Sequence, residues 1–473
     1  MSLPILSRAQ MREWETATWA TGQTEAEVIR RVGTVVARHA LQLTRPHSLI
    51  VLLAGQGHNG DDVRAAQNAL PERRVELLNV TDPQKDLPKL EALLSARPAL
   101  VVDGLFGIGL DRVLNPDWVH FIQRLNAARL PVLAVDLPSG LDADTGEPYD
   151  AAVTATVTLT VGAPKLGLIQ PAAWPFTGRI EVAEDVGLAA TLPPSELRWV
   201  MPADFAGFPP VRQVAGHKGT YGHLGIVAGS FGYHGAAVLA ARGAQRARPG
   251  LITLFPQENV YHPVAAQLQA VMVSPWSVST QMHLAYSAVL MGPGLAGPLP
   301  TNDMKQSLRR LWIDDAMPIV VDATALDWVT PHPFPQRGLQ VVTPHPGEAG
   351  RLLKKTVEQI QANRVQTLRE ISGNFGHCWV VLKGHLTLVG RATGEIYVNS
   401  TGNPFLAQGG SGDLLAGYIA GLIAQPELQA DPLHTISYAV WQHGAAADWL
   451  TREHLNWVVE DLAATIGSVG APG

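Results

Sequence analysis

Short apolar segments alternate with helical patterns along most of the chain, and this alternation limits the fold more than any other feature of the sequence. Residues 7–44 are expected to be helical, because four valines between positions 28 and 36 fall on one helical face. The expected strands of the first half are LIVLLAG (49–55), RVELLNV (74–80), ALVVDGL (99–105), PVLAVDL (131–137) and ATVTLTV (155–161). Strands separated by helices predict a mainly parallel sheet covered by helices, which is an α/β fold.

A second series of the same kind fills the C-terminal half. Its strands are expected at HLGIVAG (223–229), LITLF (251–255), YSAVLMG (286–292), PIVVD (318–322), LQVVT (339–343) and CWVVLKG (378–384), and its helices at 236–247, from Asp413 and around 437–450. Between about 189 and 215 the pattern dissolves into a proline-rich stretch, which we interpret as an interdomain boundary. The sequence therefore predicts two α/β domains, residues 1–200 and 204–473.

The composition argues against several classes of protein. The 473 residues are 46% hydrophobic and 16% charged, and their net charge of −6 argues against nucleic acid or an anionic membrane as the main partner. Cys378 is the single cysteine, so an intrachain disulfide is impossible and a reducing compartment is expected. The first residues lack the features of a signal peptide, and no apolar run has the length of a membrane span. We therefore expect a cytoplasmic protein that acts on small molecules.

Polar residues and glycine recur where the expected strands end. They are Asp103, Asp136, Gly294, Asp322, His345 and Lys383. In open α/β sheets, ligands bind beyond the carboxyl ends of the strands. The shared placement predicts ligand binding at that edge of the sheets.

The stretch NSTGNPFLAQGGSGDLLAG (399–417) joins a glycine-rich loop to the start of an apolar helix and holds one acid, Asp413. Free N–H groups of such a loop and the positive end of the helix suit a phosphate, and the acid beside it is expected to accept a proton. Lys383 and the segments MGPGLAG (291–297) and TPHPGEAGRLL (343–353) belong to the same set. Each alone is compatible with a tight turn, a helix cap or a solvated charge, but together they favour a nucleotide phosphate site.

With HKGTYGHLGIVAGS, DATAL and VLKGHLT, these motifs make residues 204–470 resemble the ADP/ATP-dependent NAD(P)H-hydrate dehydratases, which have a ribokinase-like αβα fold. The resemblance implies that the AMP part of the nucleotide contacts Lys383, Gly384, His385, Leu386, Thr387 and Gly412. It implies that the hydrated nicotinamide nucleotide contacts Ala236, Gly294, His345 and Asp413. Asp413 would take the proton of the C6 hydroxyl as that oxygen attacks the terminal phosphoryl group, and phosphate would then leave C6. ADP, or ATP, is the expected phosphoryl donor, together with magnesium.

In the N-terminal half, GQGHNG (55–60) matches the dinucleotide fingerprint G-x-G-x-x-G. Asp61 and Asp62 follow it, and their charge would repel a pyrophosphate, so we reject an ordinary dehydrogenase. Asp103 and Asp136 end two later strands, in VVDGLFGIGL (101–110) and VDLPSGLDADTG (135–146). Such an acid can simply cap the turn that follows it, and this alternative stays open for each.

Together the three segments make residues 1–200 resemble the NAD(P)H-hydrate epimerase domain, a Rossmann-like three-layer αβα fold. The resemblance implies that the hydrate site is lined by His58, Asn59, Gly60, Asp61, Asp62, Gly107, Ile108, Gly109, Leu110, Asp111, Arg112 and Val113. It assigns Asn59, Asp103 and Ser139 to a potassium ion, and Asp136 to acid/base chemistry near C6 of the substrate.

The combined prediction is a homo-oligomeric bifunctional enzyme, an isomerase fused to a lyase, that repairs hydrated NADH and NADPH and converts ADP to AMP and phosphate. One alternative is a ribokinase-like small-molecule kinase, such as a vitamin-precursor kinase. Another makes the N-terminal half a non-catalytic ligand-binding module, because His58, Asp61 and Val63 replace the residues that are usual in that loop of the family.

Overall fold

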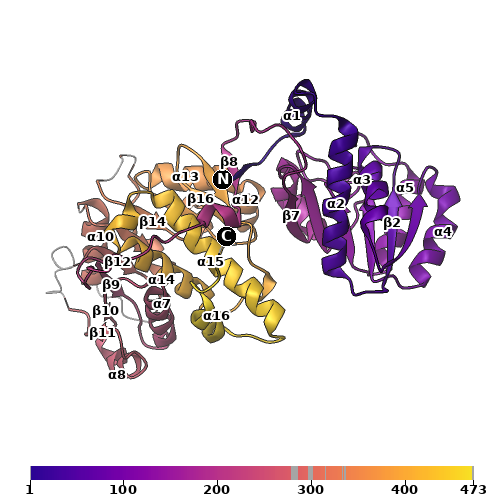
Figure 1. The fold of residues 1–473 in the computed structure, drawn as a ribbon. Coiled ribbons are helices and arrows are strands. Elements are labelled where there is room, and N and C mark those ends of the chain that lie inside the picture. The colour runs from indigo at the N-terminus through magenta and orange to yellow at the C-terminus, as the bar shows by residue number, and fades with distance from the viewer. Residues whose placement is uncertain are drawn as a thin grey trace. The chain divides into compact units, whose positions relative to one another are not determined.

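The structure of the protein is a computed structural model that describes residues 2–277, 286–296, 302–314, 316–332, 334 and 337–470. The chain forms two compact units, Leu3–Glu196 and Leu197–Gly473, and the second takes in Met1–Ser2 (Figure 1). Among the described helices, none is both long and apolar enough to cross a membrane.

The first unit is built on a parallel sheet of order β3-β2-β4-β5-β6-β7. Its strands are β2 (Leu49–Ala54), β3 (Arg74–Asn79), β4 (Leu100–Gly104), β5 (Val132–Val135), β6 (Val157–Val161) and β7 (Arg179–Ala183), after a short β1 (Leu3–Pro4). Its helices are α1 (Arg8–Ala20), α2 (Glu25–Leu43), α3 (His58–Ala66), α4 (Pro83–Ser95), α5 (Pro116–Ala127) and α6 (Trp174–Thr177).

Successive residues of the strands in the first unit pack against opposite layers of helices. Ile50 and Leu52 of β2 belong to a buried cluster with residues of α2 and α3, whereas Val51 and Leu53 belong to one with residues of α4 and α5. A parallel sheet that is apolar on both faces needs helices on both faces, and this explains the three layers. The predicted αβα fold of this half is confirmed.

The second unit contains a longer sheet of order β8-β17-β16-β15-β14-β13-β12-β9-β10-β11. Its strands run parallel except at the β15–β16 and β16–β17 pairs, which are antiparallel. The strands are β8 (Leu197–Trp199), β9 (His223–Val227), β10 (Leu251–Phe255), β11 (Met272–Val273), β12 (Ala288–Met291), β13 (Ile319–Val321), β14 (Gln340–Val342), β15 (Trp379–Leu382), β16 (Leu388–Gly390) and β17 (Ile396–Val398). The helices are α7 (His234–Ala247), α8 (Tyr261–Ala265), α10 (Asn302–Ile313), α11 (Pro346–Leu353), α12 (Val357–Ala362), α13 (Arg364–Asn374), α14 (Ser411–Ile423), α15 (Pro432–Glu453) and α16 (Val459–Thr465).

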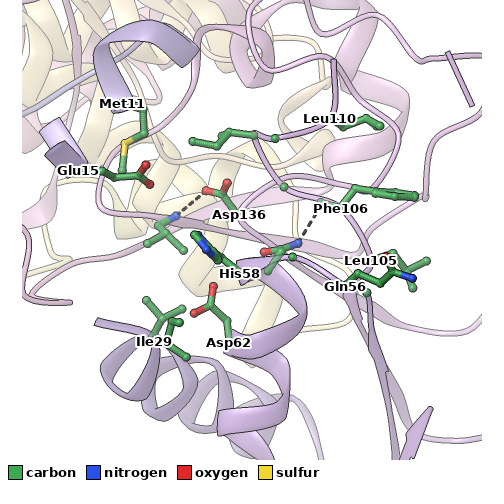
Figure 2. Close-up of a pocket in the computed structure, with 18 of the residues that line it drawn as sticks. Met11, Glu15, Ile29, Gln56, His58, Asp62, Leu105, Phe106, Leu110 and Asp136 are labelled. Carbon is green, nitrogen blue, oxygen red and sulfur yellow. Dashed lines mark hydrogen bonds between the residues drawn. The ribbon is translucent and has the colours of Figure 1, made fainter. Parts of the chain in front are cut away.

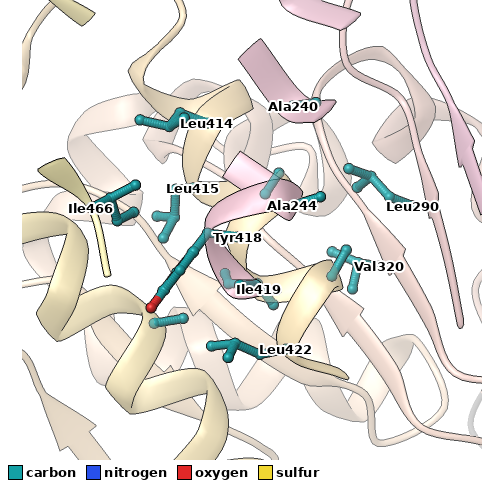
Figure 3. Packing of buried hydrophobic residues seen from close by; sticks show 14 of the residues in the cluster. Ala240, Ala244, Leu290, Val320, Leu414, Leu415, Tyr418, Ile419, Leu422 and Ile466 are labelled. Carbon is teal, nitrogen blue, oxygen red and sulfur yellow. The ribbon is translucent and has the colours of Figure 1, made fainter. Parts of the chain in front are cut away.

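Helices α7 and α14 pack closely because glycines lie at their contact. A Cβ atom added at Gly417 of α14 would lie 1.9 Å from the carbonyl oxygen of Ala240, and one added at Gly243 of α7 would lie 2.2 Å from that of Leu414. Figure 3 shows Ala240 and Ala244 of α7 among the apolar side chains of α14. The close contact fixes the position of α14, whose first turn carries the predicted base.

The predicted strands, the helices at 7–44, at 236–247 and around 437–450, and the helix from Asp413 are confirmed, with boundaries shifted by a few residues. The short strands β1, β7, β8 and β11 and the β16–β17 pair were not predicted. Because β8 pairs with β17, Leu197–Trp199 belongs to the second unit, and the division falls at Glu196–Leu197 rather than between residues 200 and 204. Gly297, which ends the predicted glycine loop, lies outside the described residues.

Candidate active sites

Asp413 lies in the first turn of α14, next to the glycine loop predicted to hold a phosphate. Gly410 precedes the helix with a φ of +93°, a left-handed conformation that favours glycine. Burial raises the pKa of Asp413 to about 7, and the charges of Asp322 and Glu348 add to the rise while Lys383 opposes it. A carboxyl with this pKa is close to half ionised at neutral pH, which suits a general base.

Lys383 follows β15 and reaches the start of α14. Its Nζ lies 2.8 Å from Asp322 Oδ1 and 3.8 Å from Glu348 Oε2. A Cβ atom added at Gly412 would lie 3.4 Å from the same nitrogen. Burial opposes the charge of Lys383, but Asp322 and Glu348 outweigh it and raise the pKa of the ammonium. A positive charge therefore stands beside the N-terminal turn of α14, where a phosphate is expected.

His345 and Glu348 form the start of α11, next to Lys383. The Nδ1 atom of His345 accepts a hydrogen bond from Gly347 N (3.0 Å), and Glu348 Oε2 accepts one from His345 N (2.8 Å), so the two residues cap the helix reciprocally. The His345 side chain is 53% exposed, which leaves its outer face free for a ligand. Thus the predicted residues His345, Lys383, Gly412 and Asp413 lie around one site, together with Asp322 and Glu348.

The other two predicted substrate contacts of this half lie side by side. Gly294 has a φ of +65°, and a Cβ atom there would lie 2.5 Å from Tyr233 O and 2.9 Å from Ala236 Cβ. The hydroxyl of Ser230 donates a hydrogen bond to the Gly294 carbonyl at 2.6 Å. Gly294 is therefore needed as glycine where the chain after β12 meets the start of α7.

The predicted nucleotide loop, Lys383–Thr387, is held by a residue that the sequence analysis missed. Arg364, at the start of α13, donates from Nη2 to Leu382 O (3.1 Å) and Leu386 O (3.4 Å). Burial lowers the pKa of this guanidinium to about 10. The carbonyl just before the loop and one carbonyl within it thus share one buried cation, which fixes the loop's shape.

His443 of α15 was also missed, and it supports the glycine loop from behind. Its Nε2 lies 3.1 Å from both the hydroxyl and the carbonyl oxygen of Ser411, the first residue of α14. Burial lowers the pKa of His443 to about 4, so the imidazole is neutral at physiological pH. Nothing in the short-range sequence pattern links these residues, since α15 meets α14 only in the folded unit.

In the first unit, a cavity of 880 Å³ opens at the carboxyl ends of the strands, between α1, α2, α3 and the 105–112 loop. Figure 2 shows Glu15, His58, Asp62 and Asp136 around it. Among the predicted residues, the lining comprises His58, Asn59, Asp62, Gly107, Ile108, Gly109, Leu110, Asp111, Arg112 and Asp136.

Three residues that were predicted to line the hydrate site lie elsewhere. Gly60 faces the backbone, since a Cβ atom there would lie 2.2 Å from Gly55 O. The Asp61 carboxylate turns toward Arg64, whose Nη1 lies 2.7 Å from it, and Val113 is 65% exposed. None of the three belongs to the lining of the cavity.

Asp136 directly follows β5 and adopts a left-handed φ of +66°. Its Oδ1 accepts hydrogen bonds from Val161 N at 3.2 Å and from Lys165 Nζ, with which it forms an ion pair. Lys165 is fully buried and also donates to Thr160 Oγ1 (3.1 Å) and Val161 O (2.8 Å). Lys165 was missed, although it follows the β6 strand and so fits the strand-end rule that identified Asp136.

The three predicted potassium ligands share one buried cluster. The Ser139 hydroxyl donates to Asp103 Oδ1 (2.6 Å) and accepts from Phe106 N (2.8 Å), while Asn59 Nδ2 donates to Phe106 O (2.9 Å). Burial raises the pKa of Asp103 to about 6. The Oδ1 atom of Asn59 is buried and has no hydrogen-bond partner among the described residues, so an oxygen-seeking cation would satisfy it.

Val63, one of the departures from the usual loop, is an ordinary core residue of α3. Its side chain is fully buried and packs against Gly104, where a Cβ atom would come within 2.3 Å of the valine. His58 lies at the start of the same helix, largely exposed, with its Nε2 atom against the carboxylate of Glu25 of α2. Neither replacement fills the cavity.

Family models match both units of the chain. One described as NAD(P)H-hydrate dehydratase matches residues 224–467, and one described as YjeF-related protein N-terminus matches residues 61–167.

Individual proteins are similar as well. A bifunctional NAD(P)H-hydrate repair enzyme Nnr from Gloeobacter violaceus is 34% identical over an alignment that covers 95% of this chain and 94% of that protein. A crystal structure of an ADP/ATP-dependent NAD(P)H-hydrate dehydratase from Bacillus subtilis, co-crystallised with ATP and Mg²⁺, is 32% identical with a TM-score of 0.49 and covers 54% of this chain and 91% of its own. A hypothetic protein from Streptococcus mutans is 26% identical with a TM-score of 0.50 over 56% of this chain and 96% of its own.

Proposed function

Since the chain belongs to the family of bifunctional NAD(P)H-hydrate repair enzymes, we propose that its second unit dehydrates the hydrated nucleotide through Asp413 and its first unit interconverts the two epimers through Asp136. The chain is thus an enzyme with lyase and isomerase activities on hydrated NADH and NADPH. Each activity is assigned to one unit because the dehydratase model matches residues 224–467 and the YjeF-related model matches residues 61–167, and because each unit has its own site.

The observation that carries the dehydratase assignment is the pairing of Asp413, with its pKa of about 7, and Lys383 at the first turn of α14. Asp413 would take the proton of the C6 hydroxyl while that oxygen attacks the terminal phosphoryl group of ADP or ATP. The N–H groups of the glycine loop, the start of α14 and Lys383 would offset charge on the phosphoryl oxygens. Phosphate then leaves C6 as a proton leaves C5, which restores the double bond of the dihydronicotinamide.

We propose that ADP or ATP binds with magnesium on the Lys383–Thr387 loop and Gly412, and that the hydrate contacts Ala236, Gly294, His345 and Asp413. Magnesium usually takes phosphate oxygens and one or two carboxylates, and Asp322 and Glu348 offer carboxylates beside Lys383. When bound, the ion would neutralise phosphate charge during transfer. Arg364 and His443 would keep the two loops in place.

For the first unit, we propose that the hydrate enters the 880 Å³ cavity with C6 near Asp136. Lys165 fixes the position of this carboxylate through their ion pair. Asn59, Asp103 and Ser139 would hold a potassium ion, which suits their oxygen atoms and the unpartnered Asn59 Oδ1.

A non-catalytic N-terminal module is the less supported alternative. His58 and Val63 leave the cavity open, and Asp61 is engaged with Arg64 outside it. The ion pair of Asp136 with Lys165 also gives the cavity a positioned acid/base group.

The proposal is tested by supplying hydrated NADH as separate R and S epimers, with ADP or ATP, and following the return of dihydronicotinamide absorbance. We expect the S epimer to be repaired directly and the R epimer after conversion. A stable phosphorylated hydrate as the final product would favour the kinase alternative. Failure to convert the R epimer faster than buffer would favour the binding module, and replacing potassium with sodium should slow that conversion alone.

A further inference from the structure

Helix α1 places a second carboxylate, Glu15, in the cavity of the first unit, and the proposed function leaves it without a role. Glu15 lines the cavity together with Asp62, Asp136 and Lys165. In Figure 2 the carboxylates of Glu15, Asp62 and Asp136 surround the same space and come from three different elements, α1, α3 and the end of β5.

The chain holds α1 firmly in this place. Leu6 N donates to Pro164 O and Leu166 N donates to Leu6 O, both at 2.9 Å, so the segment before α1 is bridged to the segment that carries Lys165. At the helix itself, Arg8 Nη2 lies 2.7 Å from Asp142 Oδ2, and Trp14 Nε1 donates to Ala189 O at 2.9 Å. Glu15, one residue after Trp14, is therefore fixed relative to Lys165 and the cavity.

Glu15 and Asp136 differ in what surrounds their carboxyl groups. Asp136 forms an ion pair with the buried Lys165. The Glu15 carboxylate has no hydrogen bond or ion pair within the described part of the chain. Burial raises the pKa of Glu15, and the charge of Asp136 adds to the rise, while Lys165, His58 and Arg12 oppose it.

Asp62 is the third acid that faces this space. Its pKa is also raised, by burial first and then by Asp136, Asp61 and Glu15. An acid and a base can be formed by two carboxyls whose surroundings differ, and here Asp136 is paired with a buried cation while Glu15, in the same cavity, is not.

We propose that Glu15 is a second catalytic carboxyl of the epimerisation, which donates a proton to the C6 hydroxyl as it leaves, while Asp136 accepts a proton from the water that arrives on the other face. This inference rests on the proposed function of the first unit. Inversion at C6 would then use two carboxyl groups, one on each face of the ring.

In the first half of the reaction the C6–O bond breaks and its electron pair stays on oxygen. That oxygen takes the Glu15 proton and leaves as water. The lone pair of N1 meanwhile forms a double bond to C6. A water oxygen then bonds C6 from the opposite face, the N1–C6 π electrons return to N1, and Asp136 takes the proton of that water. Glu15 has lost one proton and Asp136 has gained one, and exchange with solvent resets them; in the reverse direction their roles are exchanged.

The test compares variants of the full chain in R-to-S conversion. Glu15→Gln keeps the shape of the side chain but cannot donate as an acid, so conversion should fall by about a hundredfold or more, mainly in kcat. Glu15→Asp should recover part of it. Glu13→Gln, on the exposed side of the same helix, is the matched control and should match the parent. Dehydration of the S epimer should stay unchanged in all of them, which controls for concentration and folding.

Asp136→Asn separates this inference from the function it rests on. If Asp136→Asn abolishes conversion and Glu15→Gln stays within a few-fold of the parent, the role of Glu15 is refuted and the epimerase site stands. If both variants convert at the parental rate, the proposed function of the cavity itself fails.

A second measurement needs no variant. In water labelled with ¹⁸O, the parent should introduce one labelled oxygen at C6 for each inversion, beyond the exchange seen in buffer alone. Inversion without incorporation of label would overturn the proposed exchange of water across the two faces, even if Glu15→Gln failed to fold.

Discussion

At the scale of single residues, burial and the charges of Asp322 and Glu348 oppose the negative charge of Asp413. The first prediction concerns the removal of this carboxylate. Asp413→Asn should lower nucleotide-dependent recovery of NADH by about a hundredfold or more, because it removes the base and leaves the anion-binding loop intact. Binding of ADP, measured by calorimetry, should stay close to that of the parent. Glu427→Gln, an exposed acid just beyond the other end of α14, is the control. Turnover of the Asn variant near the parental rate would rule out Asp413 as base.

The pKa of Asp413 also predicts how activity depends on pH. Only the ionised carboxylate accepts a proton, so the single-turnover rate should rise with pH and level off above about 7, where the group is ionised. The effect on stability has the opposite sign. The folded pKa lies above the ordinary value of 3.8, so the stabilisation that this group contributes is present at low pH and is lost as pH rises through about 7. Replacement by asparagine should therefore raise the melting temperature relative to the parent more above pH 7 than below it, and an equal effect at both would contradict the assignment.

The ion pair of Lys165 with Asp136 gives the third prediction at the scale of single residues. Lys165→Met leaves the mostly buried Asp136 carboxylate without its cation, so we expect the first unit to lose about 3–5 kcal/mol of unfolding free energy and epimerisation to fall sharply. The double variant Lys165→Met/Asp136→Asn should recover part of the stability, because it removes the unpaired charge. Lys85→Met, at an exposed pair with Asp82, is the control in chemical denaturation. A loss no larger than that of the control would show that the pair is not needed for stability.

At the scale of elements, the site depends on loops that are braced by distant helices. The nucleotide loop between β15 and β16 is held by Arg364 of α13, and the start of α14 is held by His443 of α15 and by the glycine contact with α7. Helices α13 and α15 carry no predicted ligand contact themselves. Their contribution is to keep the loops in one shape before the nucleotide arrives, which lowers the entropic cost of binding.

Arg364→Lys tests this support. A lysine keeps the charge but cannot reach both Leu382 O and Leu386 O, and losing a charged hydrogen bond of about 1.5–3 kcal/mol should raise KM for ADP by about tenfold or more. The change in kcat should be smaller, because Asp413 is not moved directly. Arg369→Lys is a matched control, since Arg369 lies on the same helix and donates to two carbonyls of a different loop. Equal effects of the two variants on KM would argue against a specific role of Arg364.

At the scale of the whole molecule, the two sites lie in two separate compact units, each with its own sheet and core. The chain therefore carries both proposed steps without sharing a catalytic residue between them. The expected homo-oligomer and the cytoplasmic location stay predictions of the sequence.

A fragment of residues 197–473 should dehydrate the S epimer with ADP or ATP, and leave the R epimer to spontaneous interconversion. The fragment should begin at Leu197 rather than after residue 200, because β8 pairs with β17 in that unit's sheet. Adding the separate first unit should restore repair of the R epimer. Equally fast clearance of both epimers by the fragment alone would contradict the assignment of epimerisation to the first unit.

The sequence by itself determined the α/β class, both sheets' main strands and the residues at their carboxyl ends. Apolar runs of strand length and glycine-rich turns are local patterns, so they can be read without knowing what packs where. The strand-end rule then predicted ligand sites at Asp136 and Lys383, because parallel strands bring their carboxyl ends to one edge, and the glycine loop before a helix predicted one at Asp413. Lys165 follows β6 and fits the same strand-end rule, but it was not among the predicted residues.

Only the tertiary structure decided which charges meet and how strongly they act. Lys165 and Asp136 are 29 positions apart, and Lys383 and Asp322 are 61 apart, so no local pattern pairs them. The pKa of Asp413 follows from burial and from carboxylates on β13 and α11, and Glu15 reaches the cavity because α1 is bridged to the segment of Lys165. Burial and charge act through space over a few ångströms, whereas the sequence orders residues only along the chain.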